Sequence, residues 1–339
     1  MKKPKLTYNQ ILLLLAAGLL AAMVGSVTLG RYPIGLKELG GILVSRVWEL
    51  EPFWTKTQEA LLLQHRLPRI VLACMVGGSL ACAGAAYQGV FQNPMAAPDI
   101  LGASSGAAFG AALAILMKLS GTWIMVLAFC GSLLTVLLVM LVAGRARGKR
   151  VLGLILAGIM VSSLISSGTS LIKLVADPED QLPAITYWLM GGLNNAAFET
   201  LLLGAPPILM GILILYLLRW RLNLLPLSED EARASGVNIT ALRITTVICA
   251  TAITAACVAM CGQVGWVGLL VPHMCRMKFG SNHLSLLPAS VSVGAAFLIA
   301  VDTVARSASA QEIPLSILTA VIGAPFFIFL MRRKAGWNG

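Results

Sequence analysis

The chain has 339 residues, of which 58% are hydrophobic and only 12% charged, and its mean hydropathy is +0.86. A soluble domain is usually about 45–50% apolar and about 25% charged, so this composition excludes an ordinary soluble fold and predicts a polytopic membrane protein. The net charge of +11 would suit a nucleic-acid partner, but the basic residues lie in loops between apolar segments, which indicates membrane topology instead.

Ten apolar segments are candidates for membrane-spanning helices, because about 20 apolar residues cross a bilayer. In chain order they are 10–29, 67–90, 101–117, 122–143, 151–173, 200–218, 241–261, 264–276, 286–304 and 313–331. The first follows a basic start and is long enough to stay as an uncleaved span. Residues 185–198 are apolar but interrupted by Gly and Asn, so we expect an outer loop or a partial helix there. The whole chain, 1–339, is predicted to be a single transmembrane domain.

The loops predict the orientation of these spans. With the N-terminus inside, the inner segments hold most of the 25 Lys and Arg residues, whereas the outer segments hold similar numbers of basic and acidic residues. Because cytoplasmic loops carry the excess of Lys and Arg, we expect both termini on the cytoplasmic side of the membrane.

Small residues repeat every four positions in the second and third spans. Helices in lipid associate through close backbone approach, which such stripes permit. We therefore expect both spans to pack tightly against neighbours through these residues: Gly77, Ala81, Ala85 and Gly89 in the second span, and Gly102, Gly106, Gly110 and Ala114 in the third.

The fifth span carries Ser162, Ser166 and Ser170 in a similar register. Serine hydroxyls can bond to their own helix backbone, which would make these residues purely structural. A cluster on one side of a helix also suits the wall of a polar path. The residues alone leave both interpretations open.

Charged residues are almost absent from the interior of the spans. Asp302 and Arg306 stand at positions i and i+4 near the outer end of the ninth span, the spacing of a helical ion pair. Intramembrane carboxylates usually mark ion paths and proton relays, so their scarcity argues against an ion-coupled transporter and favours a pore driven from elsewhere.

The longest inner loop, 219–243, predicts a short exposed helix. Ser228 and Glu231 have the spacing of a capping box, and Gly236 is placed to end the helix. This helix is either a solvated connector or a docking site for a cytoplasmic partner.

Signs of catalysis or metal binding are lacking in the sequence. There is no G-x-x-x-x-G-K-[ST] phosphate loop, so ATP hydrolysis would belong to another chain, and we expect no catalytic residues and no cofactor. The seven cysteines show no metal spacing. His273 lacks a second ligand and follows Pro272, which would bend or end its helix. We assign His273 a structural or coupling role rather than metal or proton chemistry.

Five segments together resemble the FecCD/BtuC-type permeases, the membrane subunits of ABC importers for iron-siderophores, haem and vitamin B12. They are 65–110, 187–192, 228–236, 264–290 and 302–333. The resemblance implies a BtuC-like all-α fold of about ten transmembrane helices in the cytoplasmic membrane of a prokaryote. It implies four kinds of partner besides lipid: a second permease subunit, identical or paralogous, two cytoplasmic ATPases, an extracytoplasmic substrate-binding protein, and the cargo itself.

The resemblance also implies roles for individual residues. Binding-protein docking falls to Arg66, Arg69 and Arg306, ATPase coupling to Ser228, Glu231, Ala232 and Gly236, and pathway lining to Ser162, Ser166 and Ser170. An iron(III)-siderophore is the expected cargo, with vitamin B12 and haem as alternatives. A proton-coupled secondary transporter is the competing class, and it would need a titratable group at the midplane, for which only His273 and Asp302 are candidates. A membrane scaffold that moves nothing is the third.

Overall fold

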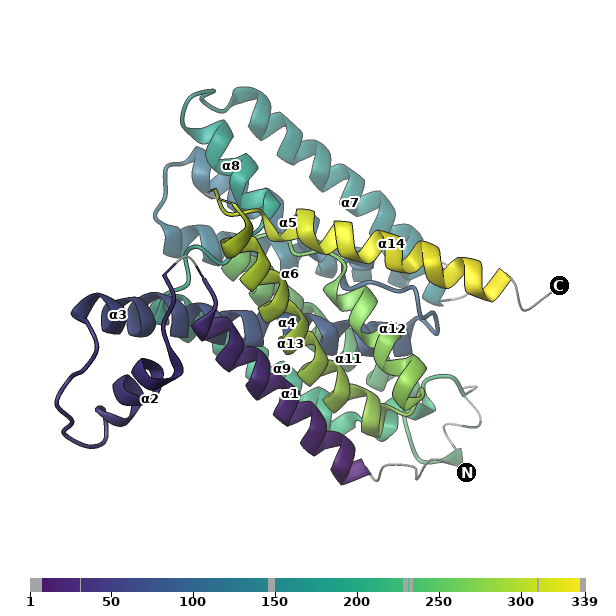
Figure 1. Ribbon diagram of the computed structural model, residues 1–339. Coiled ribbons are helices and arrows are strands. Elements are labelled where there is room, and N and C mark those ends of the chain that lie inside the picture. Colours follow the sequence, from purple (N-terminus) through teal and green to yellow (C-terminus); the bar gives the residue numbers. More distant parts are fainter. Residues whose placement is uncertain are drawn as a thin grey trace.

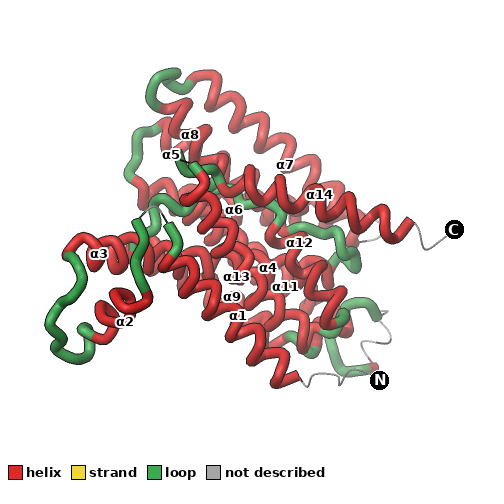
Figure 2. Tube along the Cα trace, viewed as in Figure 1, coloured by secondary structure: helices red, strands yellow, loops and turns green. Residues whose placement is uncertain are grey.

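The computed structural model describes residues 8–30, 32–145, 150–227, 231, 234–309 and 311–335. Helices are the regular secondary structure throughout this part of the chain, and no strand occurs in it (Figure 2). The long helices are α1 (Tyr8–Thr28), α4 (Leu67–Val90), α6 (Gly121–Arg145), α7 (Arg150–Val175), α9 (Phe198–Leu218), α11 (Ile239–Cys261), α13 (His283–Ala308) and α14 (Leu315–Ala335). The shorter ones are α2 (Leu36–Val44), α3 (Lys56–Ala60), α5 (Ala103–Leu116), α8 (Gln181–Met190), α12 (Val267–Phe279), the π-helical η1 (Leu61–Arg66), and the 3₁₀ turns η2 (Pro98–Leu101) and η3 (Arg221–Leu224).

Each of the ten predicted spans coincides with a helix, which confirms the all-α polytopic class. Seven described helices are long and apolar enough to cross a membrane: those within α1, α6, α7, α9, α11 and α13, and the continuous α3–η1–α4 segment Lys56–Val90. The spans predicted at 101–117, 264–276 and 313–331 correspond to shorter apolar helices, α5, α12 and the first part of α14. A 13-residue helix such as α12 rises only about 20 Å, less than the roughly 30 Å hydrocarbon core.

The centre of the bundle is formed by α4 and α11, which are mostly buried, whereas α1 and α7 are largely exposed. This order follows from composition. The central helices carry many Ala, Gly and Cys residues, which allow close approach on all sides, and the peripheral helices carry large exposed Leu and Ile residues.

The predicted small-residue stripes are contact surfaces. Gly77 of α4 faces Gly294 of α13 so closely that a Cβ on either would meet the other's carbonyl. Gly106 and Gly110 of α5 meet Gly131 and Leu127 of α6 in the same way. Because such contacts leave no room for a methyl group, α4 with α13, and α5 with α6, pack as tightly coupled helix pairs.

An additional helical segment lies between α1 and α4, where we predicted no structure. It comprises α2 and α3, which lie away from the main bundle (Figure 1). Its buried apolar residues, Leu39, Ile42 and Trp54, belong to the same apolar core as α4. The region 185–198 is a partial helix, as predicted, with α8 ending at Met190 and a loop following it.

The two ends of the bundle carry different segments. The start of α1, the end of α14 and the α12–α13 connection lie toward the lower right of Figure 1, whereas α3, the end of α1 and α8 lie on the opposite side. We refer to the first as the inner end and the second as the outer end, following the predicted topology.

Candidate functional site

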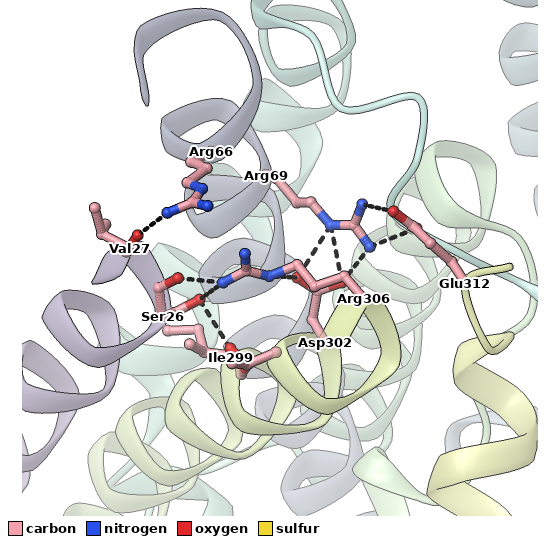
Figure 3. A network of polar contacts seen from close by, with 9 residues as sticks. Ser26, Val27, Arg66, Arg69, Ile299, Asp302, Arg306 and Glu312 are labelled. Atoms are coloured by element: carbon pink, nitrogen blue, oxygen red, sulfur yellow. Dashed lines mark hydrogen bonds and ion pairs between the residues drawn. The ribbon is translucent and has the colours of Figure 1, made fainter. Parts of the chain in front are cut away.

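Three arginines predicted from separate motifs meet at the outer end. Arg66 closes the π-helical turn η1, Arg69 lies one turn into α4, and Arg306 lies in the last turn of α13. A π turn changes the register of the side chains that follow it and is frequent at functional sites. Figure 3 shows Arg69 and Arg306 beside Asp302, with Arg69 also bonded to Glu312, while the nearby Arg66 is bonded to Val27.

Arg69 is the centre of this network. On one side its Nε and Nη2 donate to Asp302 at 2.8–3.1 Å, and on the other its Nη1 and Nη2 donate to Glu312 at 2.9 Å. The planar guanidinium is suited to two bidentate carboxylate contacts at once. Arg69 therefore ties α4 both to α13 and to the loop that leads into α14.

Arg66 and Arg306 bind the end of α1. Arg66 is buried and donates to the backbone carbonyls of Val27 and Tyr32. Arg306 donates to the carbonyl of Ser26 and, at 3.0 Å, to its Oγ. The two arginines thus supply the hydrogen bonds that the last carbonyls of a helix lack.

The predicted Asp302–Arg306 pair is present but weak in geometry, with 3.8 Å between Arg306 Nε and Asp302 Oδ2. The main partner of Asp302 is Arg69, and its own side chain is only 2% exposed. Neither this pairing nor the part that Glu312 plays in it was predicted from the sequence. The only feature of the sequence that pointed to a partner such as Glu312 was the similar number of acidic and basic residues in the outer segments.

All three arginines are therefore engaged within the chain, and none is a freely exposed side chain. They nevertheless line an open surface pocket of about 560 Å³ together with Tyr32, His65 and Glu312. Glu312 is the most accessible charged partner in the network, with a side chain that is 32% exposed. A second pocket of similar volume lies on the other side of the Arg69–Glu312 pair and is lined by α8, the 191–195 loop and the start of α14.

At the inner end, the structure describes only part of the predicted loop helix. Ser228 and Ala232 lie outside the described residues, and so does the capping box. Glu231 is helical and exposed, and its carbonyl accepts hydrogen bonds from the backbone N and Oγ of Ser235. Gly236 has φ +73° and is exposed, the left-handed conformation that ends helices, which confirms the predicted stop.

The serines of α7 lie on its exposed face. Ser166 and Ser170 are exposed, and Ser170 Oγ donates to the Ser166 carbonyl at 3.1 Å. Ser162 is half-buried and packs against Gly102 at the start of α5. The Ser170 hydroxyl is thus bonded within the helix, as the structural interpretation requires, while the face that carries Ser166 and Ser170 stays open in this chain.

His273 is buried in the middle of α12, which continues through Pro272 to Phe279. Of the two predicted effects of Pro272, bending or ending the helix, the second is therefore wrong. The imidazole packs against Phe327 of α14 with 5.5 Å between ring centroids. In the described part of the chain, no three His, Cys, Asp or Glu side chains are grouped to hold a metal ion.

Comparisons with known proteins cover nearly the whole chain. The sequence model of the FecCD transport family matches residues 14–333. The chain is 41% identical to the molybdate import system permease MolB of Haemophilus influenzae, over 97% of this chain and 98% of MolB. It is 39% identical to an iron chelatin transport system permease of Helicobacter pylori, over 81% of this chain and 83% of the relative.

A solved structure is also similar. It is an inward-facing ABC transporter assigned to the metal-chelate type, with a TM-score of 0.86, 40% identity, and coverage of 96% of this chain and 99% of the other.

Proposed function

Because the chain belongs to the FecCD transport family, it is the permease of an ABC importer, and we propose that its cargo is an iron(III)-siderophore complex. The role as a permease is supported by a likeness in sequence over residues 14–333 and a likeness in structure over 96% of the chain. We place the permease in the cytoplasmic membrane of a prokaryote, with both termini inside. Energy comes from separate ATPase subunits, because the sequence has no phosphate loop of its own.

The choice of cargo is supported by the relative named for iron chelatin transport and by the solved metal-chelate type transporter. A second candidate is molybdate, favoured by the relative that matches 97% of the chain. Vitamin B12 and haem are the further alternatives that the family resemblance supplies.

Uptake into proteoliposomes decides between these cargoes. The permease is reconstituted with its ATPase and binding protein, and radioactive iron(III)-ferrichrome, molybdate, haemin and cobalamin are offered with MgATP. We expect ATP-dependent uptake of ferrichrome. Uptake of molybdate alone would replace the siderophore by the oxyanion, and uptake driven by a pH gradient without any ATPase would overturn the ABC mechanism itself.

We place binding-protein docking at the outer arginine network. Arg66, Arg69 and Arg306 converge on one pocket from η1, α4 and α13, and the pocket is large enough to admit an acidic side chain of a partner. Because Arg69 already holds Glu312, an incoming carboxylate would have to share or displace that partner.

Glu312→Gln tests this docking site without removing an arginine that the fold needs. The change frees part of Arg69 for a partner carboxylate, so we expect tighter docking of the binding protein. Glu38→Gln, elsewhere on the outer side, makes the same change in net charge and is the matched control. Equal or weaker docking by the Glu312 variant would contradict the assignment.

We place ATPase coupling at the inner loop, 219–243. Glu231 and Gly236 are exposed there, and Ser228 and Ala232 complete the motif that the resemblance assigns to coupling. Deletion of residues 228–236 should abolish co-purification of the ATPase and leave binding-protein docking unchanged. Retained ATPase association would exclude this loop as the coupling site.

We assign the exposed serine face of α7 to the pathway, shared with a second permease subunit. Ser166 and Ser170 face outward from a helix that is otherwise covered by large apolar residues. The neighbouring subunit, identical or paralogous, would enclose these hydroxyls and so complete a polar passage that one chain leaves open on one side.

A further inference from the structure

A group of polar residues at the inner end joins the base of the coupling loop to α13. Asn223 lies in η3, five residues after α9 ends. Its Oδ1 accepts from the backbone N of His283 at 2.8 Å and lies 3.0 Å from His283 Nδ1. Its Nδ2 donates to Oδ1 of Asn282 at 2.9 Å. Asn282 is the N-cap of α13, so one amide side chain holds the first residues of that helix.

The end of α4 is held to the same segment. Gln92, just beyond α4, donates through Nε2 to the carbonyl of Leu225 at 2.9 Å. The His283 imidazole lies over Gly89 of α4, where a Cβ would come within 2.9 Å of Nε2. Glycine at this position is therefore what lets α13 begin directly against α4. The loop base at 223–225 is thus bonded to both helices.

The two helices then run together to the outer end. They are in backbone contact at Gly77 and Gly294, and a Cβ on Gly78 would lie 3.0 Å from the Val291 carbonyl. At the outer end Arg69 of α4 binds Asp302 of α13. A helix of 26 residues such as α13 is about 39 Å long, so a single pair of rigid elements connects the loop base with the arginine network (Figure 1).

We propose that Asn223 is a positioning residue that fastens the coupling loop to the α4–α13 pair and so transmits ATP-driven motion to the outer arginine network. The pair moves as one body because its interface has no space for sliding. Motion of the loop reaches the start of α13 through the bonds of Asn223 to Asn282 and His283. This inference rests on the proposed ATPase coupling and adds the residues that carry it across the membrane.

The test follows the outer end directly. The complete permease–ATPase complex is reconstituted with His65→Cys, an exposed outer residue just before α4, in a Cys130→Ser background that removes the exposed native thiol. Labelling by a membrane-impermeant maleimide is measured with and without MgATP and vanadate. In the complex that keeps Asn223, the labelling rate of the thiol introduced by His65→Cys should change when nucleotide is trapped.

Three substitutions then distinguish a loss of transmitted motion from a loss of fold stability. Asn223→Leu keeps the size and loses the side-chain hydrogen bonds to Asn282 and His283, so we expect the nucleotide-dependent change in labelling to fall about tenfold. Asn223→Asp keeps the acceptor toward His283 and should retain most of the response. Asn195→Leu, the same chemical change on an exposed asparagine of the outer loop, should retain all of it. Basal ATP hydrolysis should stay within about twofold in each, because the loop surface itself is unchanged.

Each outcome is decisive. A normal labelling response in the Asn223→Leu complex would overturn the inference while leaving the proposed function intact. Equal loss of labelling response, ATP hydrolysis and membrane yield would show that Asn223 only supports the fold. A wild-type chain that assembles no ATPase would overturn the proposed function and this inference with it.

Discussion

Asp302→Asn is expected to lower the free energy of unfolding by about 3 kcal/mol. The carboxylate is almost fully buried, accepts from Arg69 at 2.8–3.1 Å, and lies 3.8 Å from Arg306. Removing one partner of a buried ion pair usually costs about 3–5 kcal/mol, because the remaining charge is left without compensation. Here Glu312 still neutralises Arg69, which places the expected loss at the lower end.

The exposed pair Arg46–Glu59 supplies a matched control. Its N–O distance is 2.6 Å, shorter than that of Arg69–Asp302, but both side chains are well exposed, at 56% and 34%. An exposed pair typically contributes about 0–1 kcal/mol. Glu59→Gln should therefore cost under about 1 kcal/mol despite its shorter contact.

Unfolding of both variants in mixed detergent micelles, followed by helix content and by tryptophan fluorescence, measures the difference. We expect the burial of an ion pair, and not its N–O distance, to set the loss in free energy of unfolding when the pair is broken. If Asp302→Asn and Glu59→Gln lose the same amount, or if Asp302→Asn loses less than about 1 kcal/mol, the buried network does not stabilise the junction of α4 and α13.

Three further changes test the packing, the pathway and the loop. Gly294→Ala places a Cβ 2.6 Å from Ala81 Cβ and should cost about 1–3 kcal/mol by overpacking, whereas Gly18→Ala, with open space around it, should cost nothing in the same unfolding assay. Replacing Ser166 and Ser170 together by Ala should leave stability unchanged and reduce cargo uptake severalfold; unchanged uptake would remove α7 from the pathway. Gly236→Ala strains a residue at φ +73° by about 1–2 kcal/mol and should weaken ATPase association in a pull-down; undiminished association would show that this helix end is not used.

Much of the fold could be predicted from the sequence because hydropathy acts locally. Every predicted span is a helix, including α12, although α5, α12 and the apolar part of α14 are too short to cross a bilayer unaided. The α2–α3 segment escaped prediction because its buried residues, such as Leu39 and Trp54, are too few to form an apolar run.

In the candidate site, the positions of the functional residues could be predicted from the sequence, but their bonding partners could not. Arg66, Arg69 and Arg306 were placed at one end of the bundle by counting spans, and Gly236 was placed at a helix end by its chemistry. Which groups these arginines bind was not predictable, since the i, i+4 rule selects Arg306 for Asp302, whereas Asp302 binds Arg69, 233 residues away.

The sequence by itself determined the helical class, the order of the spans, and the small-residue faces, because each depends on residues within a few turns of one another. Only the tertiary structure decided that Arg69 is held between Asp302 and Glu312, and that Asn223 holds the start of α13. These contacts depend on the relative rotation and register of helices far apart in the chain. Register is set by the summed packing of whole interfaces, such as Gly77 against Gly294, and a shift of one residue would turn every one of these side chains away from its partner.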